Sequence, residues 1–435
     1  MKKLSVSFLL VTATSFINAQ NVYIPDTNFR SYLLGNPTIN INNDNEIQLS
    51  EAIAFSGTID CSGKEISSLV GIESFINLKE LICEFNNLTS LDLSKNNALI
   101  SLRCMANKLT TLDTSNNLNL VNLSCYSNQI TSLNISNNSF LKSLDCYSNQ
   151  LTSLDVTQNL NLNVLICDYN QLTNLDLSKN LSLVQLECEG NYLTVLDVSK
   201  NLALTGFNCG YNQLTNLDVS KNILLGSLSC YFNQLSALDV SKNTDLRYLS
   251  CAGNQLTILD VKNNLKLIRL GCSLNKLGSL DVSNNKSLND FYCSSNQLTS
   301  LNLKNGTNYL ITYFGAVNNP NLTCIQVDNV AYANSLSPYK DWQKDALASY
   351  NTNCSLSVAD SYTNEFELYP NPVKDHLYFS EKVSSIKIAD ISGKIISEYS
   401  STQKSVDLSR LKKGLYLIEM ITKNGTKVTK KIIKQ

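Results

Sequence analysis

Cysteine recurs at a fixed interval through the middle of this chain, and that interval constrains the fold more than any other feature. From Cys83 to Cys293 every 21st residue is a cysteine, and Cys61 lies 22 residues before Cys83. A repeat of this length is typical of a solenoid, in which each repeat forms one coil that stacks on the previous one. The sequence therefore predicts a scaffold whose function lies in the surface that it presents.

The first 19 residues have the pattern of a secretory signal peptide. Lys2 and Lys3 form a basic start, an apolar stretch runs from Leu4 to Phe16, and Ala19 ends a cleavage site. No later segment has the ~20 apolar residues that a membrane-spanning helix requires. The net charge of −1 gives no indication of nucleic acid or an anionic membrane as a partner. We therefore expect an exported protein without a membrane-spanning segment.

Export raises the question of whether the ladder cysteines form disulfides. One cysteine per coil, always at the same phase, points every thiol in one direction, which gives poor disulfide geometry between neighbouring coils. We expect these cysteines to be small, buried, inert apolar residues. The alternative, a metal array, lacks histidines and any grouping of four ligands. Cys324 and Cys354 fall outside the ladder phase, and we expect a disulfide between them.

One repeat unit, from Leu141 to Val156, reads L-x-x-L-x-C-x-x-N-x-L-x-x-L-D-V. The pattern resembles the leucine-rich repeat with cysteine in place of the third leucine, and it is similar to the cysteine-ladder branch of bacterial internalin-like proteins. The resemblance covers residues 59–327, about 13 coils. It implies a leucine-rich-repeat solenoid with a parallel β-sheet on the concave face and a mostly irregular, short-strand convex side. The last copy, with Tyr313, Gly315 and Asn318, has lost its cysteine.

Side chains alternate along each strand, so Leu144 and Cys146 point inward while Asp145 and Tyr147 point outward. The asparagine of each repeat, such as Asn170, is expected to pair backbone groups that the turn leaves without ladder partners. A column of acids follows in the second half of the coil, and turn capping is expected for it, with calcium binding as the alternative. The column comprises Asp155, Asp176, Asp197, Asp218, Asp239, Asp260 and Asp281.

Aromatic and acidic residues gather at the outward strand positions and form the candidate ligand-binding surface. Aromatic side chains dominate binding hot spots, and the outward row varies between repeats while the inward row does not. The alternative is that tyrosine simply suits strands. The candidates are Phe85, Tyr126, Asp145, Tyr147, Asp168, Tyr169, Glu187, Glu189, Tyr211, Tyr231, Phe232, Tyr248 and Tyr292.

Both ends of the solenoid need caps, because terminal coils would otherwise expose their leucines. Residues 20–58 are expected to form the N-terminal cap, with a helix that begins after Asp26 or Thr27. Residues 328–354 are expected to form the C-terminal cap, with an amphipathic helix from Tyr339 to Leu347 that the Cys324–Cys354 disulfide ties to the last coil.

The N-terminal cap contains a twelve-residue segment, 40–51, that resembles an EF-hand loop. Its ligand-type residues are Asn40, Asn42, Asp44, Glu46 and Glu51, with Glu46 offering its carbonyl. Asn40 stands where the motif has aspartate, and Asn45 stands where it has glycine. A weak calcium site and a metal-free remnant both remain open.

The tail differs from the repeats. Residues 355–366 are polar and read as a linker, and short alternating segments over 367–435 predict a small all-β sandwich. The motifs P-N-P (370–372), I-S-G-K (391–394), G-L-Y (414–416) and K-K-I-I-K (430–434) resemble, in order, the C-terminal sorting domain of type IX secretion, type A. The resemblance implies type IX secretion machinery as a partner. It places the protein on the outer-membrane surface of a Gram-negative bacterium or outside the cell.

An enzyme is not expected. The only histidine, His376, lies in the sorting tail, which excludes a serine–histidine or cysteine–histidine pair from the solenoid. Glu187 and Glu189 could form a carboxylate pair, but they lie on a flat sheet without a pocket. We expect a monomeric binding or adhesion scaffold for a protein or glycan ligand. The alternative is a passive stalk or coat component without a specific ligand.

Overall fold

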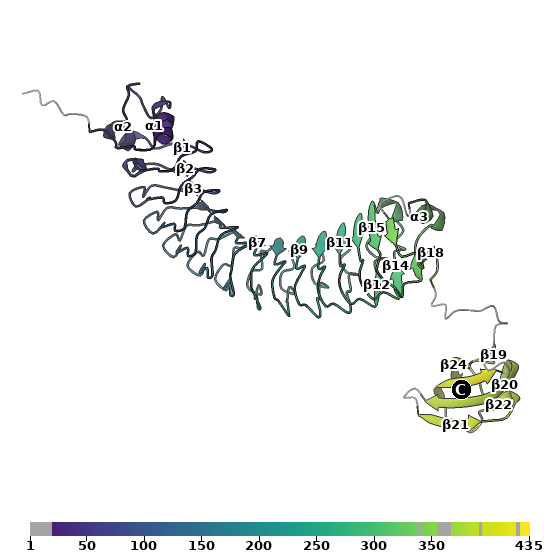
Figure 1. The fold of residues 1–435 in the computed structure, drawn as a ribbon. Helices are drawn as coiled ribbons and strands as arrows, with labels where there is room; N and C mark the ends of the chain where they lie inside the picture. Colours follow the sequence, from purple (N-terminus) through teal and green to yellow (C-terminus); the bar gives the residue numbers. More distant parts are fainter. Residues whose placement is uncertain (1–19, 337–341, 355–366, 391–393, 423–426) are drawn as a thin grey trace, which may run out of the picture. The chain divides into compact units, whose positions relative to one another are not determined.

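The computed structural model describes residues 20–336, 342–354, 367–390, 394–422 and 427–435. The expected signal peptide (1–19) and linker (355–366) lie outside the described residues. The chain divides into two compact units, Met1–Cys354 and Ser355–Gln435, and each is described by itself. Figure 1 shows the first unit as a curved solenoid and the second as a small β domain.

A parallel sheet of 14 strands lines the inner, concave side of the solenoid (Figure 1). Each repeat contributes one short strand, and central leucines such as Leu144, Leu165 and Leu186 are in register. The strands are β1 (Thr58–Asp60), β2 (Glu80–Ile82), β3 (Ser101–Arg103), β4 (Asn122–Ser124), β5 (Ser143–Asp145), β6 (Val164–Ile166), β7 (Gln185–Glu187), β8 (Gly206–Asn208), β9 (Ser227–Ser229), β10 (Tyr248–Ser250), β11 (Arg269–Gly271), β13 (Asp290–Tyr292), β15 (Tyr313–Ala316) and β17 (Trp342–Lys344). This is the concave parallel sheet that the repeat predicts.

The interior of the solenoid is filled by the inward leucines and the cysteine ladder. All twelve ladder cysteines are buried and free of disulfides, as the repeat phase predicts. The Sγ atom of Cys167 lies 3.4 Å from the carbonyl oxygen of Glu187 in the next coil, so the thiol donates a weak hydrogen bond between coils. Burial raises the pKa of the Cys167 thiol well above its usual range, so the reactive thiolate is disfavoured.

The convex side of the coil is irregular over most of the solenoid and forms strands only near the C-terminal end. There a second parallel sheet contains β12 (Ser279–Asp281), β14 (Ser300–Asn302), β16 (Cys324–Gln326) and β18 (Ser349–Asn351). At the same phase in earlier coils, the aspartate caps a turn. Asp155 Oδ1 accepts the N–H of Thr157 at 2.9 Å, and Asn134 accepts that of Ser136 at 3.1 Å. The turn-capping interpretation of the acid column is therefore supported by its hydrogen bonds.

The asparagine at the end of each strand is fully engaged with backbone, as predicted. Asn170 Oδ1 accepts the N–H of Leu151 at 3.0 Å. Its amide nitrogen donates to the carbonyl oxygens of Cys146 (3.0 Å), Cys167 (3.2 Å) and Asp168 (3.2 Å). One side chain thus joins two coils and satisfies four backbone groups of the turn. We call this set of residues the front asparagine column.

The front column corrects the predicted alignment of the last repeat. Asn319, not Asn318, accepts the N–H of Leu298 (3.2 Å) and donates to the carbonyl of Ala316 (3.0 Å), while Asn318 is exposed. Strand pairing gives the reason, because Tyr313 is in register with Asp290, 23 residues earlier. Two extra residues in this coil shift the motif, so that Ala316 takes the position of the ladder cysteine.

A second column of buried asparagines lies in the back half of the coil, and the sequence analysis missed it. Asn180 Nδ2 donates to the carbonyl oxygens of Val156 (2.9 Å) and Asn159 (3.0 Å) in the preceding coil. Its Oδ1 is buried and has no hydrogen-bond partner. The members of this back asparagine column are Asn96, Asn117, Asn138, Asn159, Asn180, Asn201, Asn222, Asn243, Asn264 and Asn285, all 0% exposed. These asparagines recur every 21 residues, in several repeats as the last residue of a Ser-Lys-Asn segment, and this regular spacing could have revealed the column from the sequence.

Two short helices close the N-terminal end. Helix α1 (Thr27–Leu34) begins after Asp26, whose side chain accepts the N–H groups of Asn28 and Phe29, as its capping position predicts. Helix α2 (Leu49–Ala54) and the 3-10 turn η1 (Ile72–Ser74) follow. Buried side chains of the cap, such as Phe29, join the same apolar core as the repeats. The first coil therefore does not expose its leucines.

The C-terminal end is built differently from the prediction. The predicted helix from Tyr339 to Leu347 is wrong, because Trp342–Lys344 form strand β17, in register with Phe314–Ala316 of β15. Trp342 is fully buried, its ring lies 5.2 Å from Phe314, and its indole N–H donates to Ile311. A helical segment would not place this indole in the leucine column. The helix of this region is α3 (Val330–Leu336), and η2 (Asn308–Leu310) precedes β15.

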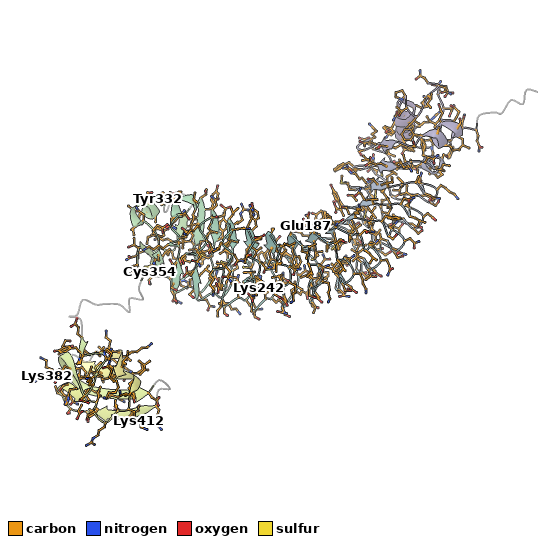
Figure 2. All side chains as sticks on the ribbon, turned by 180° about the vertical axis from the view of Figure 1, so that it is seen from behind. Glu187, Lys242, Tyr332, Cys354, Lys382 and Lys412 are labelled. Atoms are coloured by element: carbon orange, nitrogen blue, oxygen red, sulfur yellow. A yellow bond between two sulfur atoms is a disulfide. The ribbon has the colours of Figure 1, made fainter. Side chains whose placement is uncertain are left out.

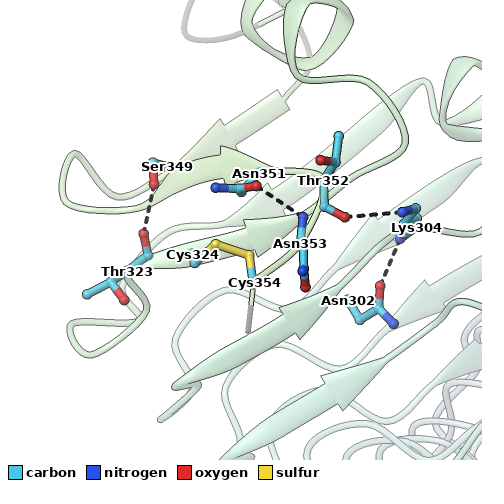
Figure 3. The surroundings of a disulfide bond; sticks show 9 residues. All are labelled: Asn302, Lys304, Thr323, Cys324, Ser349, Asn351, Thr352, Asn353 and Cys354. Atoms are coloured by element: carbon cyan, nitrogen blue, oxygen red, sulfur yellow. Dashed lines mark hydrogen bonds between the residues drawn. A yellow bond between two sulfur atoms is a disulfide. The ribbon is translucent and has the colours of Figure 1, made fainter. Parts of the chain in front are cut away.

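A disulfide between Cys324 and Cys354 links β16 to the end of the solenoid (Figure 3). Their Cα atoms are 5.8 Å apart. Beside it, Lys304 Nζ donates to the carbonyl of Thr352 at 3.2 Å. The bridge closes a loop of 30 residues over the last coil, which constrains the unfolded chain by about 3–4 kcal/mol in the loop-entropy description.

The second unit is an antiparallel β domain with its own core. Its strands are β19 (Leu368–Tyr369), β20 (His376–Asp390), β21 (Ile395–Tyr399), β22 (Gln403–Asp407), β23 (Gly414–Thr422) and β24 (Lys427–Lys434). The long strand β20 pairs with β22 along its first half and with β21 and β23 along its second half, so all six strands belong to one hydrogen-bonded sheet. Residues 391–393 of the I-S-G-K motif lie outside the described residues.

Candidate ligand-binding face

Four aromatic residues of the concave side occupy a turn position whose backbone is left-handed. Phe85, Tyr169, Tyr211 and Phe232 have φ angles of 52°, 49°, 48° and 49°. Bulky side chains rarely adopt this conformation, because it brings Cβ close to the following carbonyl oxygen. All four are exposed, from 41% for Phe232 to 61% for Phe85. The fold therefore tolerates a local backbone cost and displays these rings to solvent.

Other coils show what this turn position requires. Gly190 and Gly253 occupy the same phase with φ of 64° and 65°, and Ser127 and Ser148 occupy it with φ of 53°. Glycine is the residue that the left-handed conformation favours. Because smaller residues serve the fold in neighbouring coils, the aromatic side chains at this phase are not explained by folding alone.

The aromatic rings of the concave side form two clusters. In the first, the tyrosine cluster, Tyr147 packs edge-to-face against Tyr126 (6.1 Å between centroids) and Tyr169 (5.5 Å). In the second, the mixed cluster, Tyr211 stacks on Phe232 at 4.7 Å and meets Tyr231 edge-on at 5.3 Å. Such pairs hold one another in place. Each cluster spans consecutive coils.

Glu189 lies between the two clusters and is hydrogen-bonded to both. Its carboxylate accepts the hydroxyl of Tyr169 at 2.5 Å and the amide of Asn208 at 2.7 Å, and it also accepts the hydroxyl of Tyr231. Burial alone would raise the pKa of Glu189, but these hydrogen bonds outweigh it and hold the pKa below its usual range. The hydrogen bond to Glu189 in turn raises the pKa of Tyr169 to about 12. The carboxylate is therefore ionised and fixes one tyrosine of each cluster.

Glycines in the neighbouring coils provide room for three of the rings. A Cβ atom would lie within 2.8 Å of the Tyr169 ring at Gly190 and within 2.8 Å of the Tyr231 ring at Gly210. At Gly253 it would lie within 2.6 Å of the Phe232 ring. A real Cβ atom at these distances would displace the ring. Tyr169 and Phe232 therefore lie directly on the backbone of the next coil and Tyr231 on that of the preceding coil, which fixes the position of each ring.

Acidic side chains occupy the centre of the same face. Asp168 is 5% exposed, and its Oδ1 accepts the N–H of Glu189 at 2.5 Å. Burial, reinforced by the charges of Glu187 and Glu189, raises the pKa of Asp168 to about 7. Burial and the charge of Glu187 also raise the pKa of Asp145. The shifts reflect burial first and crowding of like charges second, and none of the four acids forms a salt bridge among the residues that the structure describes.

Two acids on either side of this centre are neutralised by arginines. Glu84 forms a salt bridge with Arg103 at 2.5 Å, and Asp290 forms one with Arg269 at 2.7 Å. Among the described residues, the acids of β5–β7 and their turns form no salt bridge, and they lie closer together than the other acids without a salt bridge on this sheet, Asp60 in β1 and Glu80 in β2. Phe85, Tyr248 and Tyr292 lie in coils outside the two aromatic clusters, so the structure brings together ten of the thirteen candidates. Figure 2 labels Glu187 on the concave side and Lys242 toward the opposite side of the solenoid.

Sequence analysis missed the residues that position this face. Asn208 shares the register position of Glu187 on the adjacent strand, so its proximity to the acids could have been inferred from phase. Gly190 and Gly253 each follow an aromatic residue by one repeat of 21 residues, and Gly210 precedes Tyr231 by the same interval, which was also visible. The left-handed turn had no signal in the sequence, because the residues at that phase are mostly not glycine or asparagine.

The EF-hand-like loop of the N-terminal cap is closed by its own hydrogen bonds. Glu51 accepts the N–H groups of Ile41 (2.8 Å) and Gln48 (2.9 Å), and Glu46 pairs with Arg30 at 2.9 Å. Asn40 donates to the carbonyl of Asp44 at 2.9 Å.

Two observations bear on calcium at this loop. The buried Oδ1 of Asn40 has no hydrogen-bond partner, and Asp44 adds a carboxylate, so oxygen ligands of the type that calcium prefers are present. Glu51, however, is already engaged by backbone N–H groups. Calcium at Asn40, Asn42, Asp44, Glu46 and Glu51 stays a prediction, and thermal unfolding with and without a chelator is the measurement that decides it.

Comparisons with known proteins bear on both units. A family model described as the secretion system C-terminal sorting domain matches residues 367–435. Internalin J of Listeria monocytogenes is 36% identical over 76 residues, which are 18% of this chain and 8% of that protein. The structure of the functional domain of that internalin includes a cysteine ladder. It aligns with 96% of this chain and 100% of that chain at 24% identity and a TM-score of 0.56. A leucine-rich-repeat protein of Leptospira interrogans aligns with 65% of this chain and 82% of that chain, at 26% identity and a TM-score of 0.55.

The class of protein follows from these findings and the geometry. The first unit is a leucine-rich-repeat solenoid of the internalin-like cysteine-ladder type, and residues 367–435 are a type IX secretion sorting domain. The chain is thus an exported leucine-rich-repeat protein of the cell surface or the exterior. None of the helices in the described part of the chain is long and apolar enough to span a membrane.

Proposed function

We propose that this protein is a binding or adhesion scaffold that holds a protein or glycan ligand on its concave face, at the two aromatic clusters and the acids between them. The observation that carries the proposal is the placement of exposed phenylalanine and tyrosine at left-handed turn positions, where most other coils have glycine, serine or alanine and one has leucine. Residues that the fold does not need and that cost local backbone energy are expected at functional sites.

The preorganisation of the face supports a specific ligand over a passive stalk. Tyr169 and Tyr231 are held by Glu189 and by the glycines beneath them, so little side-chain entropy is lost when a ligand binds. The uncompensated acids beside the clusters favour ligand groups that carry positive charge or donate hydrogen bonds. A uniform outer surface would be expected of a spacer.

The test begins with the exported chain, residues 20–435, on arrays of glycans and of surface and extracellular proteins. A Tyr126→Ser/Tyr147→Ser/Tyr169→Ser variant should keep the unfolding temperature and lose roughly ten-fold or more in affinity for any hit, because hot-spot aromatics each contribute over 1 kcal/mol. The matched control is Tyr23→Ser/Tyr192→Ser/Tyr309→Ser, which removes three exposed tyrosines outside both clusters.

A second variant tests the geometry of the face without removing any ring. Gly210→Ala should displace Tyr231, since the new Cβ would lie within 2.8 Å of that ring. We expect weaker binding with an intact fold. Hits whose affinity is unchanged in both the tyrosine and the glycine variants would contradict the assignment of this face. Arrays without any hit would favour the passive stalk.

A further inference from the structure

The turn that leads from the back of each coil to the next concave strand carries a row of exposed aliphatic side chains that the fold does not explain. Each row member stands two residues before the first leucine of its repeat and is between 52% and 59% exposed. The members are Leu118, Leu160, Leu181, Leu202, Ile223 and Leu265, and we call them the apolar row. Four of them fall in consecutive coils. Contiguous exposed apolar surface of this kind marks an interaction site, whereas single exposed leucines do not.

The repeat itself provides the control for this row. Asn97, Ser139, Thr244 and Lys286 occupy the same phase in other coils of the same solenoid. The coils that carry these polar residues stack in the same register as their neighbours. Apolar side chains at this phase therefore contribute nothing that the coil requires. The row lies in the turn that precedes each concave strand and contains none of the residues of the two aromatic clusters.

A row of lysines runs beside the apolar row. Lys179, Lys200, Lys221 and Lys242 each precede the apolar-row phase by two residues, again in four consecutive coils. All four are exposed, and none forms a salt bridge within the described part of the chain. The nearby aspartates are held by their own turns, as Asp176 is by the N–H of Ser178 at 2.9 Å. The ammonium groups are therefore free to reach beyond the aspartates.

The two rows coincide at the middle of the solenoid. The lysine row lies in the segments that lead into β7, β8, β9 and β10, the seventh to tenth strands in the order of the 14-stranded sheet. Figure 1 shows the solenoid as an arc with this sheet on the inner side, and β7 and β9 lie near the middle of the arc.

We propose that the apolar row and the lysine row together form a peripheral docking surface for an anionic lipid bilayer. Aliphatic side chains enter the boundary between headgroups and acyl chains, while the flanking ammonium groups bind lipid phosphates. The exported location of the protein provides access to such a surface. The overall charge of −1 conceals this site, because the turn-bound aspartates cancel the lysines in the sum. Two copies packed antiparallel through the same rows would instead bring lysine against lysine.

Co-sedimentation of the exported chain with vesicles tests the proposal. We expect binding to phosphatidylglycerol–phosphatidylcholine vesicles, weaker binding at high salt, and at least roughly ten-fold weaker binding to phosphatidylcholine alone, because the lysines lose their attraction to anionic headgroups. Leu181→Thr/Leu202→Thr/Ile223→Thr uses the residue that the chain itself has at position 244. Lys200→Gln/Lys221→Gln/Lys242→Gln uses the residue at position 158. Each triple variant should lose at least roughly five-fold in vesicle binding.

Controls separate this surface from the concave face. The Tyr126→Ser/Tyr147→Ser/Tyr169→Ser variant should bind vesicles like the unaltered chain, and all variants should unfold at the same temperature. Absence of vesicle binding, or equal binding by both triple variants and the unaltered chain, would overturn the proposal. A concentration-dependent dimer in analytical ultracentrifugation that the threonine variant abolishes, without vesicle binding, would also overturn it and assign the row to a second copy of the chain.

Discussion

The front and back halves of each coil use the same residue, a buried asparagine, in different ways. In the front half, Asn170 uses both ends of its amide, with one accepted and three donated hydrogen bonds to backbone. In the back half, Asn180 only donates, and its Oδ1 has no partner. The same difference recurs along the columns, since nine back-column oxygens lack a partner. The backbone of the front half is therefore held by more hydrogen bonds from its asparagine than the backbone of the back half.

This difference bears on where function is placed. The front column sets the turn that carries the aromatic residues, so the rings start from a backbone that four hydrogen bonds hold in place. The back column holds coils together through fewer bonds and leaves the convex surface to vary. A rigid front half of the coil suits a preformed ligand-binding face. The back half, which has fewer of these hydrogen bonds, tolerates a row of exposed leucines.

The largest effect is expected when a front-column asparagine is removed. Asn170→Ala leaves the N–H of Leu151 and the carbonyls of Cys146, Cys167 and Asp168 without this partner in a buried turn. We expect a loss of about 1–3 kcal/mol in the free energy of unfolding. Urea titration monitored by circular dichroism measures it. An unchanged midpoint would refute the role given to the front column.

The matched substitution in the back column should cost less. Asn180→Ala releases only the carbonyls of Val156 and Asn159, and it also removes a buried oxygen that has no partner. We expect about 0.5–1.5 kcal/mol, measured in the same titration. If Asn180→Ala proves as costly as Asn170→Ala, the two columns are equivalent and the comparison fails.

The sequence predicted the repeated parts of the fold well, because the same residue type at the same phase in many repeats outweighs the substitutions in any single repeat. Twelve cysteines at one phase indicate which side of the coil faces the core, and Asp26 before an apolar stretch indicates the start of a helix. Prediction failed where the repeat changes. Two extra residues before β15 moved the asparagine role from Asn318 to Asn319, and Trp342 extended the sheet where a helix had been expected.

The candidate face could be predicted in its membership but not in its geometry. Phase alone places Tyr126, Tyr147 and Tyr169 in neighbouring coils, and the structure joins them through ring contacts. The role of Glu189 depends on which rotamers bring two hydroxyls to one carboxylate, and a pattern of residue types does not encode that. The raised pKa of Asp168 similarly depends on burial depth and on two neighbouring acids.

The acid at the centre of the front half gives a pH-dependent prediction. The folded-state pKa of Asp168, about 7, lies above the unfolded value of 3.8, so the folded state binds the proton more tightly. The contribution of Asp168 to stability is therefore fully present below pH ~4 and is lost as pH rises toward ~7. Asp168→Asn should raise stability by about 1 kcal/mol at pH ~8 and have little effect at pH ~4.

Thermal unfolding of both proteins across this pH range checks the effect of Asp168. Asp176→Asn is the control, because that exposed carboxylate has a lowered pKa from its hydrogen bonds to Ser178 and no buried charge to relieve. A stabilisation by Asp168→Asn that is the same at both pH values would show that packing, not charge, is responsible.

The smallest effect concerns the unpaired oxygens of the back column, and the chain contains its own precedent for repairing them. Thr114 donates its hydroxyl to Asn138 Oδ1 at 2.8 Å, whereas most other coils have valine or leucine at that phase. Val198 stands 24 residues before Asn222, as Thr114 stands before Asn138, and the Oδ1 of Asn222 has no partner. Val198→Thr should supply the missing donor.

Burying a threonine hydroxyl in place of a valine methyl usually destabilises, because the hydroxyl loses water without gaining a partner. At Val198 the new hydrogen bond should offset that cost, so that the free energy of unfolding changes by less than about 0.5 kcal/mol or increases. Thr114→Val, which removes the existing bond, should lower stability by about 1 kcal/mol. If Val198→Thr costs as much as a typical buried valine-to-threonine change, the unpaired oxygen is not available to a donor from the preceding coil.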